Sequence, residues 1–244
     1  ARPRGWRRSG SRVQLIGKIS GFFSFSGNNS LETELVKRIL QKKFPEMFTG
    51  IVEATVQVKE IRDAGEGKRI SVTRPETLEE VSEGESISLS GTCLTVEEFD
   101  SESISFFLAE ETLDKTWFSD IFEGDVLNFE RSLTPDDRMG GHIVQGHVET
   151  SAEIFQIEEL EEGWNFRFEK PDSLENLLVH KGFIAVEGIS LTVTDIDEES
   201  FSVTVIPETW ERTNFSRKNE GDQVNLEPDM MAKYVQKNME KREE

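Results

Sequence analysis

Gly91-Thr-Cys-Leu-Thr-Val96 has a close match in Gly188-Ile-Ser-Leu-Thr-Val193, 97 residues further along the chain. The two hexapeptides belong to longer segments, 84–128 and 181–225, which align without a gap and are identical at 18 of 45 positions. Solenoid repeats span about 20–50 residues, whereas a spacing near one hundred is the length of a small domain. The chain therefore holds two copies of one domain. Positions at which the copies differ are the first candidates for function.

A shorter match extends the duplication upstream, where Gly50-Ile-Val-Glu53 aligns with Gly146-His-Val-Glu149 at a spacing of 96. One residue was therefore gained or lost between the two matches. A domain of about one hundred residues can bury an adequate core without disulfides. We accordingly divide the chain into a basic extension at 1–46, a first domain at 47–141, a second at 142–228 and a terminal helix at 229–244.

Each copy alternates apolar and polar residues over short runs, which predicts strands. The predicted strands are 55–61, 86–89, 94–96 and 103–107 in the first copy, and 152–157, 183–186, 191–193 and 201–205 in the second. Helical periodicity is brief within the copies, at 75–81 and 173–179, and clear only at 230–244, where Met231, Tyr234, Val235 and Met239 share one face. Many short strands with short connections favour closed antiparallel barrels, which leave no exposed edge. The predicted fold class is all-β, with two tandem β-barrels and a C-terminal α-helix.

The 244 residues carry a net charge of −20, and this charge is unevenly distributed. Residues 1–46 hold ten Lys and Arg against three Glu, a balance of +7, so the rest of the chain carries −27. A surface that acidic argues against nucleic acid or an anionic membrane as a partner of the repeats. A strongly solvated surface and a specific basic partner both remain open explanations. No apolar run approaches the roughly 18 residues of a membrane span.

The single cysteine, Cys93, rules out an intrachain disulfide and indicates a reducing compartment such as the cytoplasm. The first 29 residues are rich in Arg, Ser and Gly and contain no acid, which resembles an organelle transit peptide. Met47 opens the first repeat, so residues 1–46 are equally compatible with upstream sequence. We expect a cytoplasmic protein, or an organellar one if the extension is a transit peptide.

Cys93 occupies a position that the second copy fills with Ser190. A lone cysteine is commonly a small buried hydrophobe. Here, however, its repeat counterpart is polar, and Thr95 and Thr192 are kept two residues later in both copies. Residues two apart on a strand share a face. That face is expected to present a thiol or hydroxyl beside a threonine in each barrel.

The glycine-rich run Gly140-Gly-His-Ile-Val-Gln-Gly-His147 contains two of the three histidines. A spacing of five on a strand directs His142 and His147 to opposite faces, and too few other His or Cys residues exist for a zinc site. Glycines allow a close backbone approach to a planar ligand, and an imidazole beside it can act as acid, base or hydrogen-bond donor. No phosphate loop, dinucleotide fingerprint or zinc motif is present. We therefore expect neither a metal nor a cofactor.

Three further features of the sequence each have a structural and a ligand-binding explanation. Lys181 aligns with Gly84 and Glu187 with Ser90, so these charges belong to the second copy alone. A lone lysine is usually solvated. The repeated Glu-Thr pair, 111–112 and 208–209, follows a strand end, where it suits a turn or hydrogen bonding to a polyol or heterocycle.

The motifs considered together are Met47-Phe-Thr-Gly-Ile-Val52, Gly91-Thr-Cys-Leu-Thr-Val96, Glu111-Thr-Leu113, Gly140-Gly-His-Ile-Val-Gln-Gly-His-Val148, Lys181-Gly-Phe-Ile184, Gly188-Ile-Ser-Leu-Thr-Val193 and Ile206-Pro-Glu-Thr-Trp-Glu-Arg-Thr213. In order and spacing, from Met47 to about Val235, they resemble riboflavin synthase. The resemblance implies two Greek-key six-stranded barrels that each hold a lumazine, no cofactor or metal, and a C-terminal helix that assembles a homotrimer. It implies transfer of a four-carbon unit between two molecules of 6,7-dimethyl-8-ribityllumazine, with the active site formed where barrels of two subunits meet. Lumazine synthase is the implied protein partner.

Carried over residue by residue, the resemblance also implies the site residues. The N-terminal pocket would be lined by Gly50, Ile51, Val52, Cys93, Leu94, Thr95, Phe107, Leu108, Ala109, Glu110, Glu111 and Thr112. The C-terminal pocket would be lined by Gly146, His147, Val148, Lys181, Ser190, Leu191, Thr192, Ile206, Pro207, Glu208, Thr209, Trp210 and Glu211. The candidates for proton transfer or addition are Cys93, Ser86, His142 and His147, with Ser190, Lys181 and Asp229 in support.

The chain departs from the family pattern at a few positions. Ser90 stands where the family often has Asn, and Glu149 and Glu187 stand where it often has Asp. These departures concern ligand contacts more than the reaction. Two alternatives to the enzyme are a non-catalytic lumazine-binding protein of the same fold and a purely structural double barrel.

Overall fold

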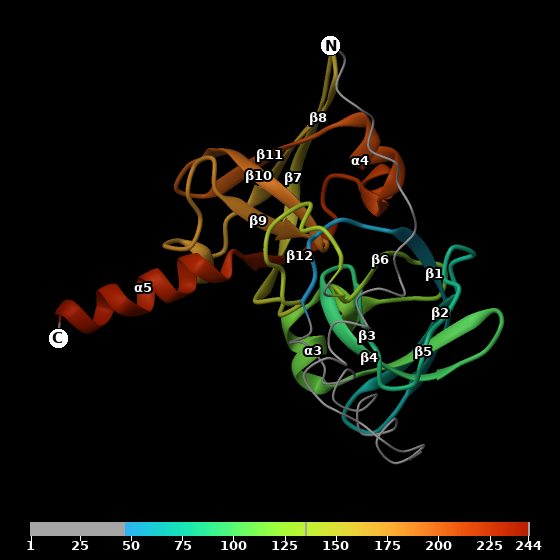
Figure 1. The fold of residues 1–244 in the computed structure, drawn as a ribbon. Helices are drawn as coiled ribbons and strands as arrows, with labels where there is room; N and C mark the ends of the chain where they lie inside the picture. The colour runs from blue at the N-terminus through green and yellow to red at the C-terminus, as the bar shows by residue number, and fades with distance from the viewer. Residues whose placement is uncertain (1–46, 135, 244) are drawn as a thin grey trace, which may run out of the picture. The chain divides into compact units, whose positions relative to one another are not determined.

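The computed structural model describes residues 47–134 and 136–243, and the predictions for the extension at 1–46 lie outside this part of the chain. The described residues form two closed six-stranded antiparallel barrels and a C-terminal helix, as the sequence predicts (Figure 1). In the first barrel the strands are β1 (Ala54–Asp63), β2 (Lys68–Thr73), β3 (Ser86–Leu89), β4 (Thr92–Phe99), β5 (Ser103–Leu108) and β6 (Val126–Arg131). Their order around the barrel, β1-β2-β5-β4-β3-β6, is a Greek key.

The second barrel repeats this order with strands numbered six higher. Its strands are β7 (Thr150–Leu160), β8 (Gly163–Glu169), β9 (Phe183–Val186), β10 (Ile189–Ile196), β11 (Ser200–Val205) and β12 (Gln223–Pro228). Every predicted strand is confirmed, although the sequence analysis set out no strand for β2, β6, β8 and β12. Alternate residues of each strand point inward, and the two barrels have separate apolar cores.

The predicted helical segments at 75–81 and 173–179 are wrong as regular helices. The first contains only a turn, and the second only the 3-10 turn η2 (Asp172–Leu174) and the turn that follows it. Their apolar residues, among them Leu78 and Leu177, are buried against the core of their own barrel. Burial at the end of a barrel therefore explains the helix-like spacing of the apolar residues.

Short helices instead connect the last two strands of each barrel. The sequence analysis set these segments out as strand ends and turns. They are α3 (Glu110–Lys115) with η1 (Trp117–Asp120), and α4 (Pro207–Arg212) with η3 (Asn214–Arg217). Thr116 and Thr213 cap the two 3-10 helices, since each hydroxyl accepts a hydrogen bond from the backbone two residues on. The repeated threonine thus serves the same capping role in both copies.

The repeated glycines of the motif meet each other between the barrels. A Cβ on Gly91 would lie 2.8 Å from the backbone nitrogen of Gly188, and one on Gly188 would lie 2.6 Å from that of Gly91. Both residues have positive φ angles, 84° and 75°. Only glycine allows this backbone conformation and this close approach together. The β3–β4 and β9–β10 turns are therefore packed backbone to backbone.

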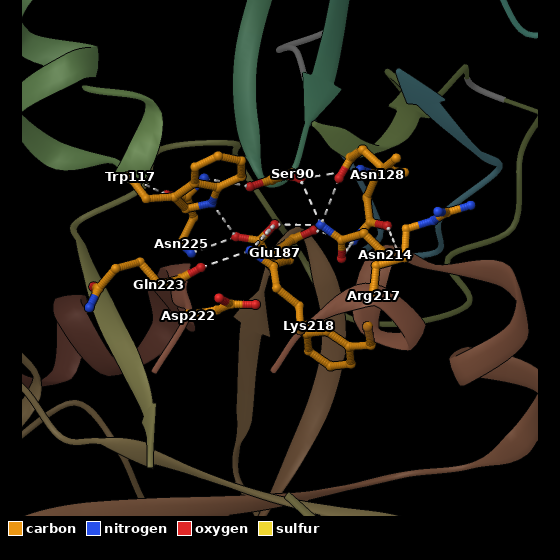
Figure 2. Close-up of polar contacts among 12 residues, drawn as sticks. Ser90, Trp117, Asn128, Glu187, Asn214, Arg217, Lys218, Asp222, Gln223 and Asn225 are labelled. Carbon is orange, nitrogen blue, oxygen red and sulfur yellow. Dashed lines mark hydrogen bonds and ion pairs between the residues drawn. The ribbon is translucent and has the colours of Figure 1, made fainter. Parts of the chain in front are cut away.

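A buried polar network surrounds this contact and joins the barrels with near-twofold symmetry (Figure 2). The side chain of Asn128 donates to the carbonyl oxygen of Glu187 at 2.9 Å and accepts from the backbone nitrogen of Asn214 at 2.7 Å. Asn225 makes the corresponding bonds to the Ser90 carbonyl and the Trp117 nitrogen, at 3.0 and 3.1 Å. The repeated asparagine thus satisfies the backbone of the opposite barrel.

Glu187 breaks the symmetry of the network. Its fully buried carboxylate accepts hydrogen bonds from the indole of Trp117, the backbone of Asn225 and the side chain of Asn214, each at 2.7 Å. The ammonium of Lys218 lies 3.8 Å from this carboxylate and 4.4 Å from the centre of the Trp117 ring. Glu187 and Ser90 also share positive φ angles, 52° and 43°. The difference at this pair therefore belongs to the contact between the barrels.

The C-terminal helix α5 (Met230–Glu243) follows β12 directly, and in Figure 1 its last turns lead away from the barrels. Asp229 caps it by accepting a hydrogen bond from the Met231 nitrogen at 3.0 Å. Its apolar face is exposed, and Tyr234 on this face is 62% accessible. No helix within residues 47–134 and 136–243 is long and apolar enough to cross a membrane.

Candidate active site

A pocket of about 280 Å³ opens on the first barrel beside Cys93. It is lined by Thr92, Cys93, Ala109, Glu111, Thr112, Lys115, Thr116, Gly146, His147 and Val148. The start of β4 provides the cysteine, and α3 provides the Glu-Thr pair. The remaining wall comes from the loop before β7. This pocket gathers a thiol, an imidazole, a carboxylate and an ammonium at one place.

The loops that complete the two sites are exchanged between the barrels. The Gly146 carbonyl, before the second barrel, accepts the backbone N–H of Cys93 in the first barrel at 2.8 Å. The Gly50 carbonyl, before the first barrel, accepts the N–H of Ser190 in the second at 2.8 Å. Val52 belongs to the core of the second barrel. An isolated bridge between Phe48 and Val144 lies where the two loops meet.

This exchange corrects the grouping of site residues stated above. Residues 50–52 lie with the second barrel, and residues 146–148 lie with the first, the reverse of the assignment by sequence order. A Cβ on Gly50 would approach Ser190 to 2.6 Å, and one on Gly146 would approach the Cys93 Cβ to 2.5 Å. Hydrogen bonding and close packing to the opposite barrel therefore hold each loop there, and proximity in sequence does not predict it.

The site on the second barrel contains His142. Its Nδ1 lies 2.7 Å from the Ser190 hydroxyl, and its ring stacks on Phe183 with 5.1 Å between ring centres. Burial lowers the pKa of His142, an effect that the negative charge of Asp229 opposes. Asp229 and Phe183 also line a neighbouring apolar groove of about 680 Å³ along α5. Two further hollows, of about 500 and 520 Å³, contain none of the candidate residues except Ile51.

Three buried polar atoms have no hydrogen-bond partner within the described part of the chain. They are the hydroxyls of Ser86 and Thr92 and the Nε2 of His142. Buried polar atoms are almost always paired in folded proteins. Thr92 lines the Cys93 pocket, and His142 lies at the corresponding site of the other barrel. Polar groups of a ligand bound at these two sites would satisfy the Thr92 hydroxyl and the His142 Nε2.

Comparison with known proteins agrees with this arrangement. The model of the Lumazine binding domain matches the chain twice, at residues 49–132 and 145–229. The riboflavin synthase of Schizosaccharomyces pombe is 39% identical over 196 residues, which cover 80% of this chain and 94% of that protein. The riboflavin synthases of Bacillus subtilis and Escherichia coli are 37% and 38% identical and cover 81% and 78% of this chain, and 92% and 90% of their own lengths.

The chain belongs to the riboflavin synthase family.

Solved structures show the same fold. LumP in complex with 6,7-dimethyl-8-(1'-D-ribityl) lumazine aligns with a TM-score of 0.68 at 23% identity, over 75% of this chain and 99% of that one. LumP in complex with riboflavin aligns with a TM-score of 0.69 at the same identity and coverage. At this level of identity the likeness concerns the architecture of the two barrels.

Several residues carried over from the riboflavin synthase family lie away from the two sites. The side chains of Leu94, Leu108 and Leu191 are buried in the barrel cores. Trp210 stacks on Trp164 with 4.0 Å between ring centres. Alternation explains the leucines, since each neighbours an outward-facing residue on its strand. These four side chains therefore pack in or against the barrel cores.

Other predicted residues are at the surface. Lys181 is exposed, with a φ of 65° where the first copy has Gly84 at 79°. This left-handed conformation is common to both copies and favours glycine, so it does not explain the lysine. The exposed candidates outside the Cys93 pocket are Ile51, Thr95, Phe107, Glu110, Thr192, Ile206, Pro207, Glu208 and Glu211, with Thr209 half-buried. Ser86 lies opposite Thr95 in the β3–β4 ladder, and its side chain is buried.

The sequence analysis did not identify Thr92, Lys115 and Thr116 as lining residues, nor two buried glutamates, Glu130 and Glu227, behind the exchanged loops. The glutamates align at the spacing of 97 found for the domains. Extending the aligned segment by two residues would have revealed them.

Within the described residues no group of three or more His, Cys, Asp or Glu side chains is placed to hold a metal ion.

Proposed function

We propose that this chain is a riboflavin synthase that acts on two molecules of 6,7-dimethyl-8-ribityllumazine. One molecule gives a four-carbon unit to the other, and the products are riboflavin and 5-amino-6-ribitylaminouracil. Membership of the riboflavin synthase family supports the reaction. The lumazine and riboflavin complexes of LumP show ligands of this kind on the same double-barrel architecture.

The observation that carries this proposal is a pair of sites built alike but with different side chains. Each site joins the start of a strand in one barrel to the glycine loop of the other. At the matched position one site has Cys93 and the other has Ser190, hydrogen-bonded to His142. Two similar sites suit the binding of two molecules of the same substrate. Different side chains in the two sites suit the different reactions of the molecule that gives the carbon atoms and the molecule that receives them.

The chemistry requires loss of a proton from the 7-methyl group of one lumazine and addition of a nucleophile or water to the other. Cys93, Ser86, His142 and His147 are the proposed groups for these steps. Cys93 and His147 line one pocket, where a thiol and an imidazole can serve addition and proton transfer together. The lowered pKa of His142 favours the neutral imidazole, which can accept a proton. Stacking of two lumazine rings would supply part of the rate by orientation.

The deciding experiment mixes the purified protein with the lumazine alone, without added metal or cofactor, and follows riboflavin by its absorbance. Riboflavin and 5-amino-6-ribitylaminouracil in equal amounts are expected, at half the lumazine consumed. Binding without product would instead identify a lumazine-binding protein. Absence of both binding and product would exclude both functions.

The proposed assembly is a homotrimer with active sites between subunits, as the resemblance implies. Met231, Tyr234, Val235 and Met239 expose an apolar face on α5 that is about three fifths accessible in a single chain. Sedimentation equilibrium is expected to give three times the 27.8 kDa chain mass. A Tyr234→Glu, Val235→Glu variant is expected to sediment as a monomer, and a trimeric mass for this variant would exclude α5 as the contact.

Two further parts of the proposal concern the surroundings of the enzyme. A complex with lumazine synthase would appear as co-sedimentation of the two purified proteins. A cytoplasmic location is proposed, or an organellar one if residues 1–46 direct import. Fluorescent fusions with and without these residues distinguish the two locations, since only the first would move to an organelle.

A further inference from the structure

Glu227, on β12 of the second barrel, binds the loop that closes the Cys93 pocket of the first barrel. Its carboxylate accepts the backbone N–H groups of Gln145, Gly146 and His147 at 2.7, 2.9 and 2.9 Å. Its side chain is buried, with 5% of the residue surface exposed. Three consecutive donors thus converge on one carboxylate immediately behind the pocket wall.

Glu130, on β6 of the first barrel, makes the equivalent contacts 97 residues earlier. Its carboxylate accepts the backbone N–H and the hydroxyl of Thr49 at 2.7 and 2.9 Å, and the N–H of Gly50 at 3.1 Å. It is also 5% exposed. The two barrels therefore contain the same arrangement of a buried carboxylate and the loop that it binds.

Each clamped loop supplies a wall to the opposite barrel. The loop held by Glu227 accepts the N–H of Cys93, and the loop held by Glu130 accepts the N–H of Ser190, both at 2.8 Å. The same loops carry His147 and Ile51 at the next positions. A displacement of the loop held by Glu227 would therefore alter the Cys93 pocket of the first barrel. A displacement of the loop held by Glu130 would alter the site at Ser190 in the second barrel.

Burial makes these glutamates costly to retain for stability alone. Desolvation raises the pKa of Glu130 to about 7, and it raises the pKa of Glu227 as well, although the bonds from the loops act in the opposite direction. A buried carboxylate stabilises a fold only when its hydrogen bonds offset the loss of water. All the hydrogen bonds described for the two carboxylates go to the exchanged loops, so their role is to order these loops.

We propose that Glu227 is a positioning residue for the pocket of the N-terminal barrel and Glu130 for the site of the C-terminal barrel. Each carboxylate acts across the molecule through the loop that it holds. This inference rests on the proposed function only in naming the ligand, 6,7-dimethyl-8-ribityllumazine. The loop geometry stands without it.

The test measures amide hydrogen exchange by NMR at pH 8, above the pKa of about 7 of Glu130. Glu227→Gln places an amide group against N–H donors, so it removes at least one charge-assisted bond. Exchange at the Cys93 amide is expected to rise about tenfold, while exchange at Ser190 stays unchanged. Glu130→Gln is expected to give the reverse pattern. Glu187→Gln, the same change in a buried carboxylate that contacts neither loop, is the matched control and is expected to affect neither amide.

A ligand titration adds a functional readout. Glu227→Gln and Glu130→Gln are each expected to raise the Kd for the lumazine about tenfold at one of two sites, with a larger change in KM than in kcat. Glu227→Asp, which keeps the charge one methylene short, is expected to recover part of the affinity. It also replaces Glu227→Gln if that variant does not fold.

The outcomes separate this inference from the proposed function. Faster exchange in the barrel that carries the substitution, in both barrels equally, or in neither, would overturn the positioning role. The crossed exchange pattern together with no riboflavin formation would leave the positioning role intact and reject the enzyme.

Discussion

The Nδ1 of His142 lies 2.7 Å from the hydroxyl of Ser190, although 48 residues separate them in sequence. Ser190 in turn occupies the position that Cys93 holds in the first barrel. A histidine that follows the first domain is therefore hydrogen-bonded to the residue that replaces the cysteine of the first site. The pair gives the second site a hydroxyl–imidazole contact where the first has a thiol near His147.

Removal of the Ser190 hydroxyl tests this contact. Ser190→Ala leaves both ring nitrogens of the buried His142 without a partner, since Nε2 has none among the described residues. We expect a loss of about 1–3 kcal/mol in the free energy of unfolding, measured in urea, together with slower riboflavin formation. Thr204→Ala, an exposed change on the neighbouring strand β11, serves as the control. Equal effects of the two changes would contradict the role of the contact.

Replacement of the Cys93 thiol by a hydroxyl tests the difference between the two sites directly. Cys93→Ser installs in the first barrel the residue of the second, and the hydrogen bond to Gly146 persists because it comes from the backbone. We expect kcat to fall about tenfold or more, with a melting temperature within a few degrees of the wild type. Steady-state kinetics and calorimetry measure the two quantities. An unchanged kcat would remove Cys93 from the chemistry.

The raised pKa of Glu130 predicts a pH-dependent stability. The pKa is about 7 in the folded chain and 4.5 for an ordinary glutamate, so between these values the folded state holds a proton that the unfolded state has lost. The free energy of unfolding should therefore fall as pH rises from about 4.5 to 7, by about 3 kcal/mol at most. Glu130→Gln should abolish this component, which urea titrations at pH 5, 6 and 7 would measure.

Other groups do not obscure this comparison. The lowered pKa of His142 makes stability rise with pH up to its unfolded value of 6.5, the opposite sign. Because His142 and Glu227 are present in both proteins, their contributions cancel in the difference between wild type and variant. A difference that does not change from pH 5 to 7 would refute the raised pKa.

Glu187 and Lys218 form an ion pair at the contact between the barrels, and this pair predicts a measurable coupling energy (Figure 2). Lys218→Met leaves the fully buried Glu187 without its cation, and we expect a loss of about 3 kcal/mol in the free energy of unfolding. Adding Glu187→Gln removes the charge while keeping an acceptor for Trp117 and Asn225. The double variant is expected to be more stable than Lys218→Met alone. Additive losses in the double-mutant cycle would show that the two charges do not interact.

The sequence predicts more of the fold than of the sites. Strand positions follow from alternation, which each strand carries by itself, and Cys93, Ala109, Glu111, Thr112, His147 and Val148 do line one pocket. The spacing at 75–81 was misleading because apolar residues that close the end of a barrel recur much as they do on a helix. Lys181 stays a prediction, since it is exposed and the backbone conformation that it shares with Gly84 does not explain the difference between the copies.

The sequence by itself determined that this chain is two copies of one barrel in the riboflavin synthase family, because repeats and alternation are properties of contiguous residues. Only the tertiary structure decided which loop serves which barrel. Gly146 contacts Cys93 at a sequence separation of 53 residues, and Gly50 contacts Ser190 at a separation of 140. Because the two copies are alike, each loop has two similar barrels with which it could pack. The choice between them depends on packing at the turns of Gly91 and Gly188 and on the hydrogen bonds of Glu130 and Glu227, which no local pattern records.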